Sequence, residues 1–140
     1  MIETVELQAV ARDGSLRRVK LALELAPRPM LSVELEGRDL GSGSGDNVFV
    51  ALMNARLILE QEGQLLCCQG ARVNVFASGM LQQFSGGRQA YVLTDKQSLA
   101  DSEIVDVLAP ASPDEVVTVA EQRAFVFRFF KLDDRSSGQA

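Results

Sequence analysis

The residues best suited to chemistry gather in one short stretch, CCQGARVNVFASGM, at positions 67–80. It holds the thiols of Cys67 and Cys68 and the hydroxyl of Ser78, each of which needs a nearby base or cation to become a nucleophile. The chain has no histidine, which excludes Ser-His-Asp and Cys-His catalysis and every zinc site with a histidine ligand. Two cysteines are also too few for a four-thiolate zinc site within one chain.

The two thiols lie in an apolar context, and the nearest cationic residue along the chain is Arg72. A reactive thiol needs closer electrostatic help to lower its pKa, so the sequence favours buried structural cysteines. A thiol-dependent enzyme that uses Cys68 is a remote alternative. Ser78 is interpreted as a turn residue. Adjacent cysteines rarely bridge each other, so we expect reduced thiols and a cytoplasmic protein.

Arg72 and Arg88 are the second chemical feature, because each follows a glycine-containing pair and precedes β-forming residues. A double-arginine anion clamp is one hypothesis. The natural register of an antiparallel hairpin here sets Val75 opposite Tyr91, which places the two arginines at opposite ends. The register therefore disfavours a local clamp.

The same register predicts that Arg72, Asn74, Phe76 and Arg88 share one face of the hairpin, together with Ala90 and Val92. A strip that mixes arginine, asparagine and phenylalanine has the composition of a protein-interaction surface. Ordinary packing beneath covering helices is the alternative.

Alternating apolar and polar residues predict three strands on short links, an antiparallel meander, over residues 2–10, 19–25 and 31–36. Residues 37–45 end in GSGSG and are predicted to form a flexible loop. This loop lacks the Gly-Lys-Ser/Thr ending of a phosphate loop, and Asp46 would repel an anion.

A helix is predicted over residues 47–62, with Asp46 as its N-cap and Gly63 at its end. It carries two apolar stripes, where a surface helix normally shows one. The second stripe therefore predicts a further cover, which is either another helix of the chain or a second subunit. The stripes are Val48, Leu52, Ala55 and Leu59, and Val50, Met53 and Leu57.

Further along, a capping box at Thr118 predicts a helix to about Leu132, which we favour over a strand for the phenylalanine-rich residues 125–130. The last residues, 133–140, are predicted to be a disordered tail. Short strands are expected near 65–68, 72–77, 88–94 and 104–108, with a loop over 78–88. We therefore expect one α+β domain over residues 1–132, namely a three-strand meander, a helix, two or three strands and a C-terminal helix, with helices on one face of the antiparallel sheet.

The composition limits the partners. A chain of 140 residues with 46% hydrophobic residues can bury a core, and its net charge of −5 disfavours nucleic acid. No apolar run is long enough for a membrane span, and no signal peptide is recognisable.

The acidic residues Asp101, Glu103 and Asp106 lack the spacing of a calcium-binding loop, and they are interpreted as a charged turn. We expect no cofactor, metal, nucleic acid or membrane partner.

The run CCQGARVNVFASGM, with GGRQAYVL, DSEIVDVLAP and TVAEQRAF after it, resembles a family of small uncharacterised bacterial proteins. Its members share Cys, Gly-Ala-Arg, Ser-Gly-Met and Gly-Gly-Arg elements, and the resemblance covers roughly residues 46–130. It implies a bacterial cytoplasmic setting and no activity, cofactor or catalytic residue. The positions that it emphasises are Cys68, Gly70, Arg72, Ser78, Gly79, Met80 and Arg88.

We therefore expect a non-catalytic interaction or accessory protein, inhibitory or regulatory toward another bacterial protein in one version. It would self-associate as a homo-oligomer through the doubly apolar helix or the Arg72/Phe76 face. The alternative is a small-ligand or anion-binding domain, with the 78–88 loop closing over a pocket near Arg88 and Tyr91.

Overall fold

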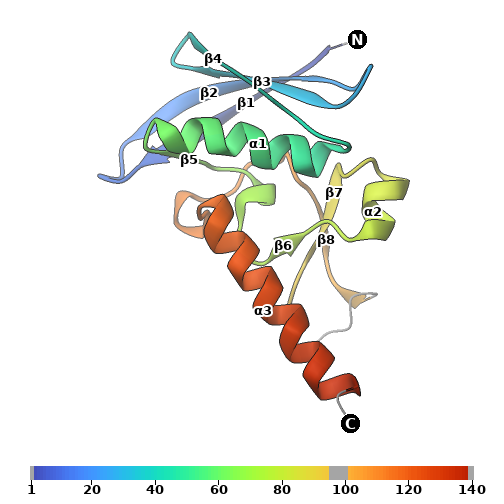
Figure 1. The fold of residues 1–140 in the computed structure, drawn as a ribbon. Coiled ribbons are helices and arrows are strands. Elements are labelled where there is room, and N and C mark those ends of the chain that lie inside the picture. The colour runs from blue at the N-terminus through green and yellow to red at the C-terminus, as the bar shows by residue number, and fades with distance from the viewer. Residues whose placement is uncertain (1, 95–100, 139–140) are drawn as a thin grey trace.

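The computed structural model describes residues 2–94 and 101–138, with side chains through Lys131. In this part of the chain, two antiparallel sheets and three α-helices form an α+β fold, as the sequence predicts. Figure 1 shows the larger sheet above helix α1 (Val48–Gln61), with the smaller sheet and helix α3 (Val119–Gly138) below that helix.

The larger sheet has five strands in the order β4-β3-β2-β1-β5. Strands β1, β2 and β3, which are consecutive along the chain, form the predicted antiparallel meander. Alternation places one side of each strand in the core, so that Leu21 pairs with Val33 on the covered face. Helix α1 covers this face, while the opposite face carries charged residues. The strands are β1 (Ile2–Ala11), β2 (Leu16–Glu24), β3 (Met30–Leu35), β4 (Arg38–Ser44) and β5 (Gln64–Leu66).

The flexible loop predicted over residues 37–45 is wrong, because strand β4 occupies most of it and pairs with β3. Two of its glycines, Gly43 and Gly45, allow a close approach to α1. A Cβ added to Gly43 would lie 2.3 Å from the backbone nitrogen of Ala55, and one added to Gly45 would lie 2.5 Å from Cγ1 of Val50. Strand β4 can therefore lie directly on α1 only because these positions lack side chains.

Helix α1 begins one residue later than predicted, with Asn47 as its N-cap instead of Asp46. The Asn47 Oδ1 accepts the backbone N–H of Val50 at 3.0 Å, while the carboxylate of Asp46 pairs with Arg28 at 3.1 Å. Gly63 follows the end of the helix with a positive φ of 73°, which is the conformation that a terminating glycine supplies.

The smaller sheet has the order β6-β7-β8, with β6 at Val75–Phe76, β7 at Gln89–Val92 and β8 at Ile104–Asp106. The predicted register is wrong by one residue, because Val75 pairs with Val92 and Phe76 pairs with Tyr91. A shift of one residue exchanges the two faces of a strand.

The predicted loop over residues 78–88 contains a short helix, α2 (Gly79–Phe84). Ser78 is its N-cap, since its Oγ accepts the backbone N–H of Leu81 at 3.3 Å. The connection between β6 and β7 is therefore long because it holds this turn of helix.

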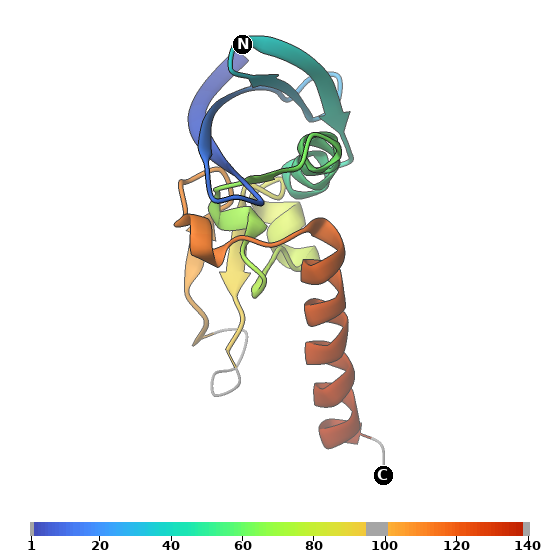
Figure 2. The ribbon, with the colours of Figure 1, turned by 90° about the vertical axis from the view of Figure 1, so that its left-hand side faces the viewer.

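Helix α3 confirms the capping box and the helical choice for the phenylalanine-rich segment. Glu121 Oε1 accepts the backbone N–H of Thr118 at 3.0 Å, and Thr118 Oγ1 accepts that of Glu121 at 3.1 Å. The helix continues past Leu132, where the sequence predicted its end, to Gly138. Residues 139–140 of the predicted tail lie outside the described residues. Figure 2 shows α3 running beside the smaller sheet and pointing away from the larger one.

The apolar interior is divided in two. The larger cluster lies between the five-stranded sheet and α1, and it extends to Val75, Val92 and Val107 in the lower half. The smaller cluster lies beneath α3 and contains most of the aromatic rings. No helix within the described residues is long and apolar enough to cross a membrane.

Candidate interaction surface

The two thiols of the opening stretch are free and buried. The backbone N–H of Cys67 donates to the carbonyl of Gln8 at 2.8 Å, and Cys68 pairs with Pro110 through an isolated antiparallel β-bridge of the backbone. Burial raises the pKa of both thiols, and that of Cys68 reaches about 12. Both thiols are therefore protonated at neutral pH, which is unfavourable for nucleophilic chemistry.

Arg56 of α1 is the most deeply placed charged group in the described structure, with 1% of its surface exposed. Its guanidinium donates to the backbone carbonyls of Gly70 at 3.2 Å and Val117 at 2.8 Å, and to Oε1 of Gln122. Burial lowers the pKa of Arg56 from its ordinary value. Carbonyl oxygens, rather than a carboxylate, satisfy its donors.

Gln122 of α3 completes this arrangement. Its Nε2 lies within donor distance of three carbonyl oxygens, at 2.8 Å from Gly70, 2.9 Å from Arg72 and 3.0 Å from Val75. Arg56 and Gln122, which we call the polar hub, thus join α1, α3 and the 70–75 segment. The sequence reasoning missed both residues. The available signal was a lone arginine on the apolar face of a predicted helix.

Arg72 and Asn74 secure the 67–80 segment rather than forming an open face. Arg72 Nη1 donates to Oε1 of Gln69 at 2.7 Å, and its Nε lies 3.7 Å from Oε2 of Glu115. Asn74 Nδ2 donates to the carbonyl of Leu93 at 3.1 Å. These side chains are therefore engaged within the chain.

Arg88 is engaged too, in a clasp between the two sheets. Its Nη1 and Nη2 each lie 2.8 Å from the carboxylate of Glu3, and its Nε lies 2.7 Å from Asp106. The hydrogen bond from Arg88 is the main cause that lowers the pKa of Glu3. Arg88, Glu3 and Asp106 therefore tie β1 to β7 and β8.

The glycines before Arg88 support the start of α1. The carbonyl of Gly86 accepts the backbone N–H of Val48 at 2.7 Å, and a Cβ on Gly87 would lie 2.5 Å from Oδ1 of Asn47. The Gly-Gly-Arg element is thus a structural joint.

Phe76 leaves the predicted face because the shifted register pairs it with Tyr91, and because strand β6 begins only at Val75, so that Arg72 and Asn74 lie outside the strand. Its ring meets that of Phe130 edge-on, with centroids 5.3 Å apart, and Tyr91 is buried beside it. The structure therefore does not bring Arg72, Asn74, Phe76 and Arg88 together on one face. What it brings together beneath α3 is an aromatic cluster of Phe76, Leu81, Tyr91, Leu93, Phe125, Val126, Phe129 and Phe130.

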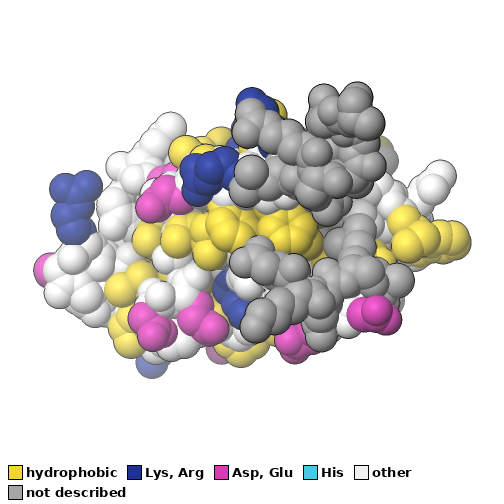
Figure 3. All heavy atoms as spheres, turned by 90° about the horizontal axis from the view of Figure 1, so that it is seen from below, with side chains coloured by type: hydrophobic (Ala, Val, Ile, Leu, Met, Phe, Trp, Pro, Cys, Tyr) yellow, Lys and Arg dark blue, Asp and Glu magenta, His cyan; other side chains and the backbone are white. Residues whose placement is uncertain are grey.

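Much of this aromatic cluster reaches the surface. Tyr91, Leu81 and Leu93 are buried, but the phenylalanines are only partly covered. Figure 3 shows a band of hydrophobic side chains across this underside of the molecule, with charged side chains at its borders. An apolar band of this kind on a folded chain is typical of a contact surface.

Between α1 and α3 the apolar surface is hollowed into a groove of about 300 Å³, which we call the α1–α3 groove. Phe127 stands at its rim with 65% of its surface exposed. The second apolar stripe of α1 borders the same region, and Leu57 of that stripe is 42% exposed. Helix α3 therefore covers this stripe only in part. The groove is lined by Phe49, Val50, Met53, Val75, Phe76, Gln82, Gln122, Arg123, Val126 and Phe127.

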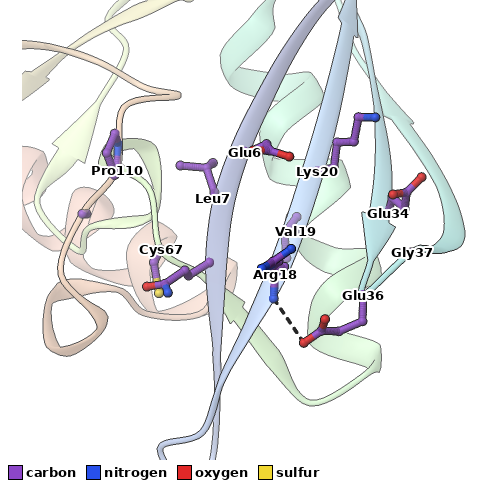
Figure 4. A pocket seen from close by; sticks show the side chains of 12 residues that line it. Glu6, Leu7, Arg18, Val19, Lys20, Glu34, Glu36, Gly37, Cys67 and Pro110 are labelled. Carbon is purple, nitrogen blue, oxygen red and sulfur yellow. Dashed lines mark hydrogen bonds between the residues drawn. The ribbon is translucent and has the colours of Figure 1, made fainter.

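A second hollow, of about 670 Å³, lies over the uncovered face of the larger sheet, and charged as well as apolar side chains line it. Figure 4 shows Glu6, Lys20 and Glu34 on its three neighbouring strands, where Lys20 pairs in register with both glutamates. Within the described residues, neither the ammonium of Lys20 nor the guanidinium of Arg18 has a hydrogen-bond or ion-pair partner. We call this hollow the sheet cleft.

Among the described side chains, those of residues 2–94 and 101–131, no group of three or more cysteine and acidic residues is close enough to hold a metal ion. No protein-family model matches the chain, and no curated protein matches it significantly.

Proposed function

We propose that this protein is non-catalytic and acts by binding protein, with association between copies of the chain as its first form. The observation that carries the proposal is the α1–α3 groove, an apolar hollow with an exposed phenylalanine at its rim. Exposed apolar surface of this kind is stabilised when a partner removes it from water.

The state of the polar groups supports the same conclusion. The thiols are buried with raised pKa values, and Arg72 and Arg88 form bonds within the chain. A general base or an activated nucleophile is therefore not among the residues that the sequence emphasised. We retain a bacterial cytoplasmic setting, and an inhibitory or regulatory role toward another protein, as parts of the proposal.

Light scattering coupled to size-exclusion chromatography tests this function directly. We expect a mass above the 15.2 kDa of one chain, and a mass that rises with protein concentration if the association is weak. A monodisperse monomer from micromolar to near-millimolar concentration, together with no captured protein in a pull-down, would contradict the proposal.

The sheet cleft favours a second candidate, a small-ligand or anion-binding domain. Its volume is in the range of ligand sites, and its unpaired Arg18 and Lys20 suit an anionic group that also contacts backbone or amide donors. This location differs from the pocket near Arg88 and Tyr91 that the sequence suggested.

A thermal-shift screen with phosphates, nucleotides and carboxylates tests the second candidate. A ligand that binds the folded state raises the melting temperature by mass action, and the rise should disappear in Arg18→Ala and Lys20→Ala. The matched control is Arg17→Ala, a neighbouring exposed arginine that does not line the cleft. No shift with any compound would exclude this candidate for the classes tested.

A further inference from the structure

We infer that the α1–α3 groove is filled by Phe127 of a second copy of the chain, with the two α3 helices antiparallel. This inference rests on the proposed self-association and specifies its geometry. It follows from three features of α3, which are an exposed aromatic knob, an exposed stripe that can meet its own copy, and the charges along one edge of that stripe.

The knob is Phe127. Its ring is exposed, and Nζ of Lys131 lies 5.4 Å from the ring centroid. The hollow beside it is bounded by Met53 of α1 and by Arg123 and Val126 of α3. A knob next to a hollow of matching chemistry on one surface is what a two-fold interface requires, because each copy then gives one ring and receives one.

The stripe runs along the exposed side of α3, and its residue Phe127 also lines the groove, so the stripe adjoins the groove there. Ala120, Ala124, Phe127 and Lys131 are all exposed, and their spacing of four, three and four residues places them in one line on a helix. Gln122, on the opposite side, is buried in the polar hub. The two alanines allow a second helix to approach closely, so that the larger Phe127 can reach across.

The charges decide the direction of the second helix. Glu121 and Arg128 are exposed, seven residues apart, and therefore lie on the same edge of the stripe. In a parallel pair of α3 helices, the edge with Glu121 and Arg128 would face the other edge of the partner's stripe, where Arg123 and Phe130 lie, so Arg128 would meet no carboxylate there. An antiparallel pair sets Glu121 of each copy against Arg128 of the other, and such edge charges select partner and orientation.

The register follows from the same spacing. When Ala124 of one helix faces Phe127 of the other, Glu121 and the partner's Arg128 differ by about 3 Å along the helix axis, two residues at 1.5 Å each. On the other edge Arg123 comes beside Phe130 of the second copy, so like charges do not meet there. In this register the partner's Phe127 enters at the level of Ala124, next to the groove wall that Arg123 forms.

Two charge variants test the geometry. Arg128→Glu alone leaves two glutamates facing each other across the interface, and Glu121→Lys alone leaves lysine facing arginine. We expect each variant to raise the dimer dissociation constant by about tenfold or more, whereas an equimolar mixture recovers wild-type affinity as a heterodimer with complementary edges.

The mixture carries its own control. Glu121→Lys also removes the capping-box bond to Thr118, so circular dichroism must show that each variant is helical before mixing. Any loss caused by the cap persists in the mixture, and only the restored charge pairs can recover affinity. Sedimentation velocity at several concentrations measures the dissociation constants.

A matched pair of phenylalanine variants tests the knob. Phe127→Ala should weaken the dimer by about tenfold or more, because two buried aromatic anchors are lost per dimer. Phe84→Ala removes a ring that is 83% exposed on α2 and does not line the groove, and it should leave the dissociation constant unchanged.

The possible results distinguish self-association in general from the antiparallel α3 interface in particular. A wild-type chain that is monomeric at every concentration overturns both the self-association and this interface. A wild-type dimer that tolerates Phe127→Ala, or whose two charge variants fail to recover on mixing, overturns the antiparallel α3 interface and leaves self-association standing.

Discussion

At the scale of single residues, we expect substitutions in the polar hub of Arg56 and Gln122 to cause the largest losses in the free energy of unfolding. Four backbone carbonyls and one side-chain oxygen accept hydrogen bonds from these two residues, both of which are buried. Replacing Arg56 removes a cation whose own burial is costly, but it also leaves the carbonyl of Val117 and Oε1 of Gln122 without the donor that they have in the folded chain. The second effect dominates, because unsatisfied buried groups cost more than the net value of each bond.

We therefore expect Arg56→Met, which roughly conserves volume, to lower the free energy of unfolding by ~3 kcal/mol or more. Urea denaturation followed by circular dichroism measures the change. Arg28→Ala is the control, because its exposed ion pair with Asp46 contributes only about 0–1 kcal/mol. If the two variants lost equal free energy of unfolding, the polar hub would contribute no more to stability than an exposed ion pair.

The Arg88 clasp makes a prediction about acid stability. Arg88 holds the pKa of Glu3 below its ordinary value of 4.5, so the unfolded chain binds this proton more readily than the folded chain. The stabilisation is therefore present above about pH 4.5 and is lost as the pH falls through the lower folded-state pKa. Because Glu3 is largely exposed, the effect is small, at most about 1 kcal/mol.

Glu3→Gln should lower stability slightly at pH 7 and give a flatter decline of stability toward acid pH than wild type. Melting temperatures across the pH range from 3 to 7 measure the difference. The prediction would be refuted by parallel curves, since these would mean that Glu3 titrates alike in the folded and unfolded chains.

The thiols make a further prediction at this scale. Burial keeps both cysteines protonated, with a pKa of about 12 for Cys68, so iodoacetamide should not label the native protein at pH 7. Mass spectrometry should show two labels after unfolding in urea and none before. Rapid labelling of the native chain would revive the thiol-enzyme hypothesis.

At the scale of secondary structure elements, the packing of β4 on α1 explains a stretch that the sequence made look like a loop. Gly43 lies against the backbone of α1 with no room for a methyl group, and Asn54 Nδ2 donates to the carbonyl of Ser44 at 2.7 Å. The helix thus covers the last strand of the sheet. A flexible loop and a strand packed this closely on a helix can both be rich in glycine and serine. Only the contact with α1 shows that this stretch is a strand.

Gly43→Ala should therefore destabilise the protein by about 1–3 kcal/mol, the usual cost of overpacking. Thermal unfolding measures the loss. Ser42→Ala, on the exposed side of the same strand, is the control and should change stability by less than about 0.5 kcal/mol. If Gly43→Ala proved as stable as wild type, the close contact of β4 with α1 would be refuted.

At the scale of the whole molecule, the chain has one well-buried half and one half that is incompletely covered. The five-stranded sheet and α1 enclose the larger cluster, whereas the aromatic cluster under α3 remains partly open. A second copy on α3 would cover part of the open surface, and this would link stability to concentration because only folded chains associate.

The melting temperature of the wild type should therefore rise with protein concentration, and that of Phe127→Ala should rise less. Differential scanning fluorimetry over a wide concentration range measures both. A melting temperature independent of concentration in the wild type would argue against association of the folded chain, whatever the contact surface.

The sequence by itself determined the features that depend on near neighbours along the chain. Alternation predicted the meander, the Thr118–Glu121 pattern predicted the start of α3, and Gly63 predicted the end of α1, because each of these signals acts within a few residues. The absence of histidine excluded Ser-His-Asp and Cys-His catalysis and every zinc site with a histidine ligand.

Only the tertiary structure decided the register of the β6–β7 pair, the role of the glycines in β4 and the place of Arg88. Arg56 and Gln122 are 66 residues apart, and Arg88 and Glu3 are 85 apart. Contacts over such separations leave no periodic pattern in the sequence, since they arise from how whole elements pack. For that reason the predicted Arg72/Phe76 face gave way to the α1–α3 groove with Phe127 at its rim.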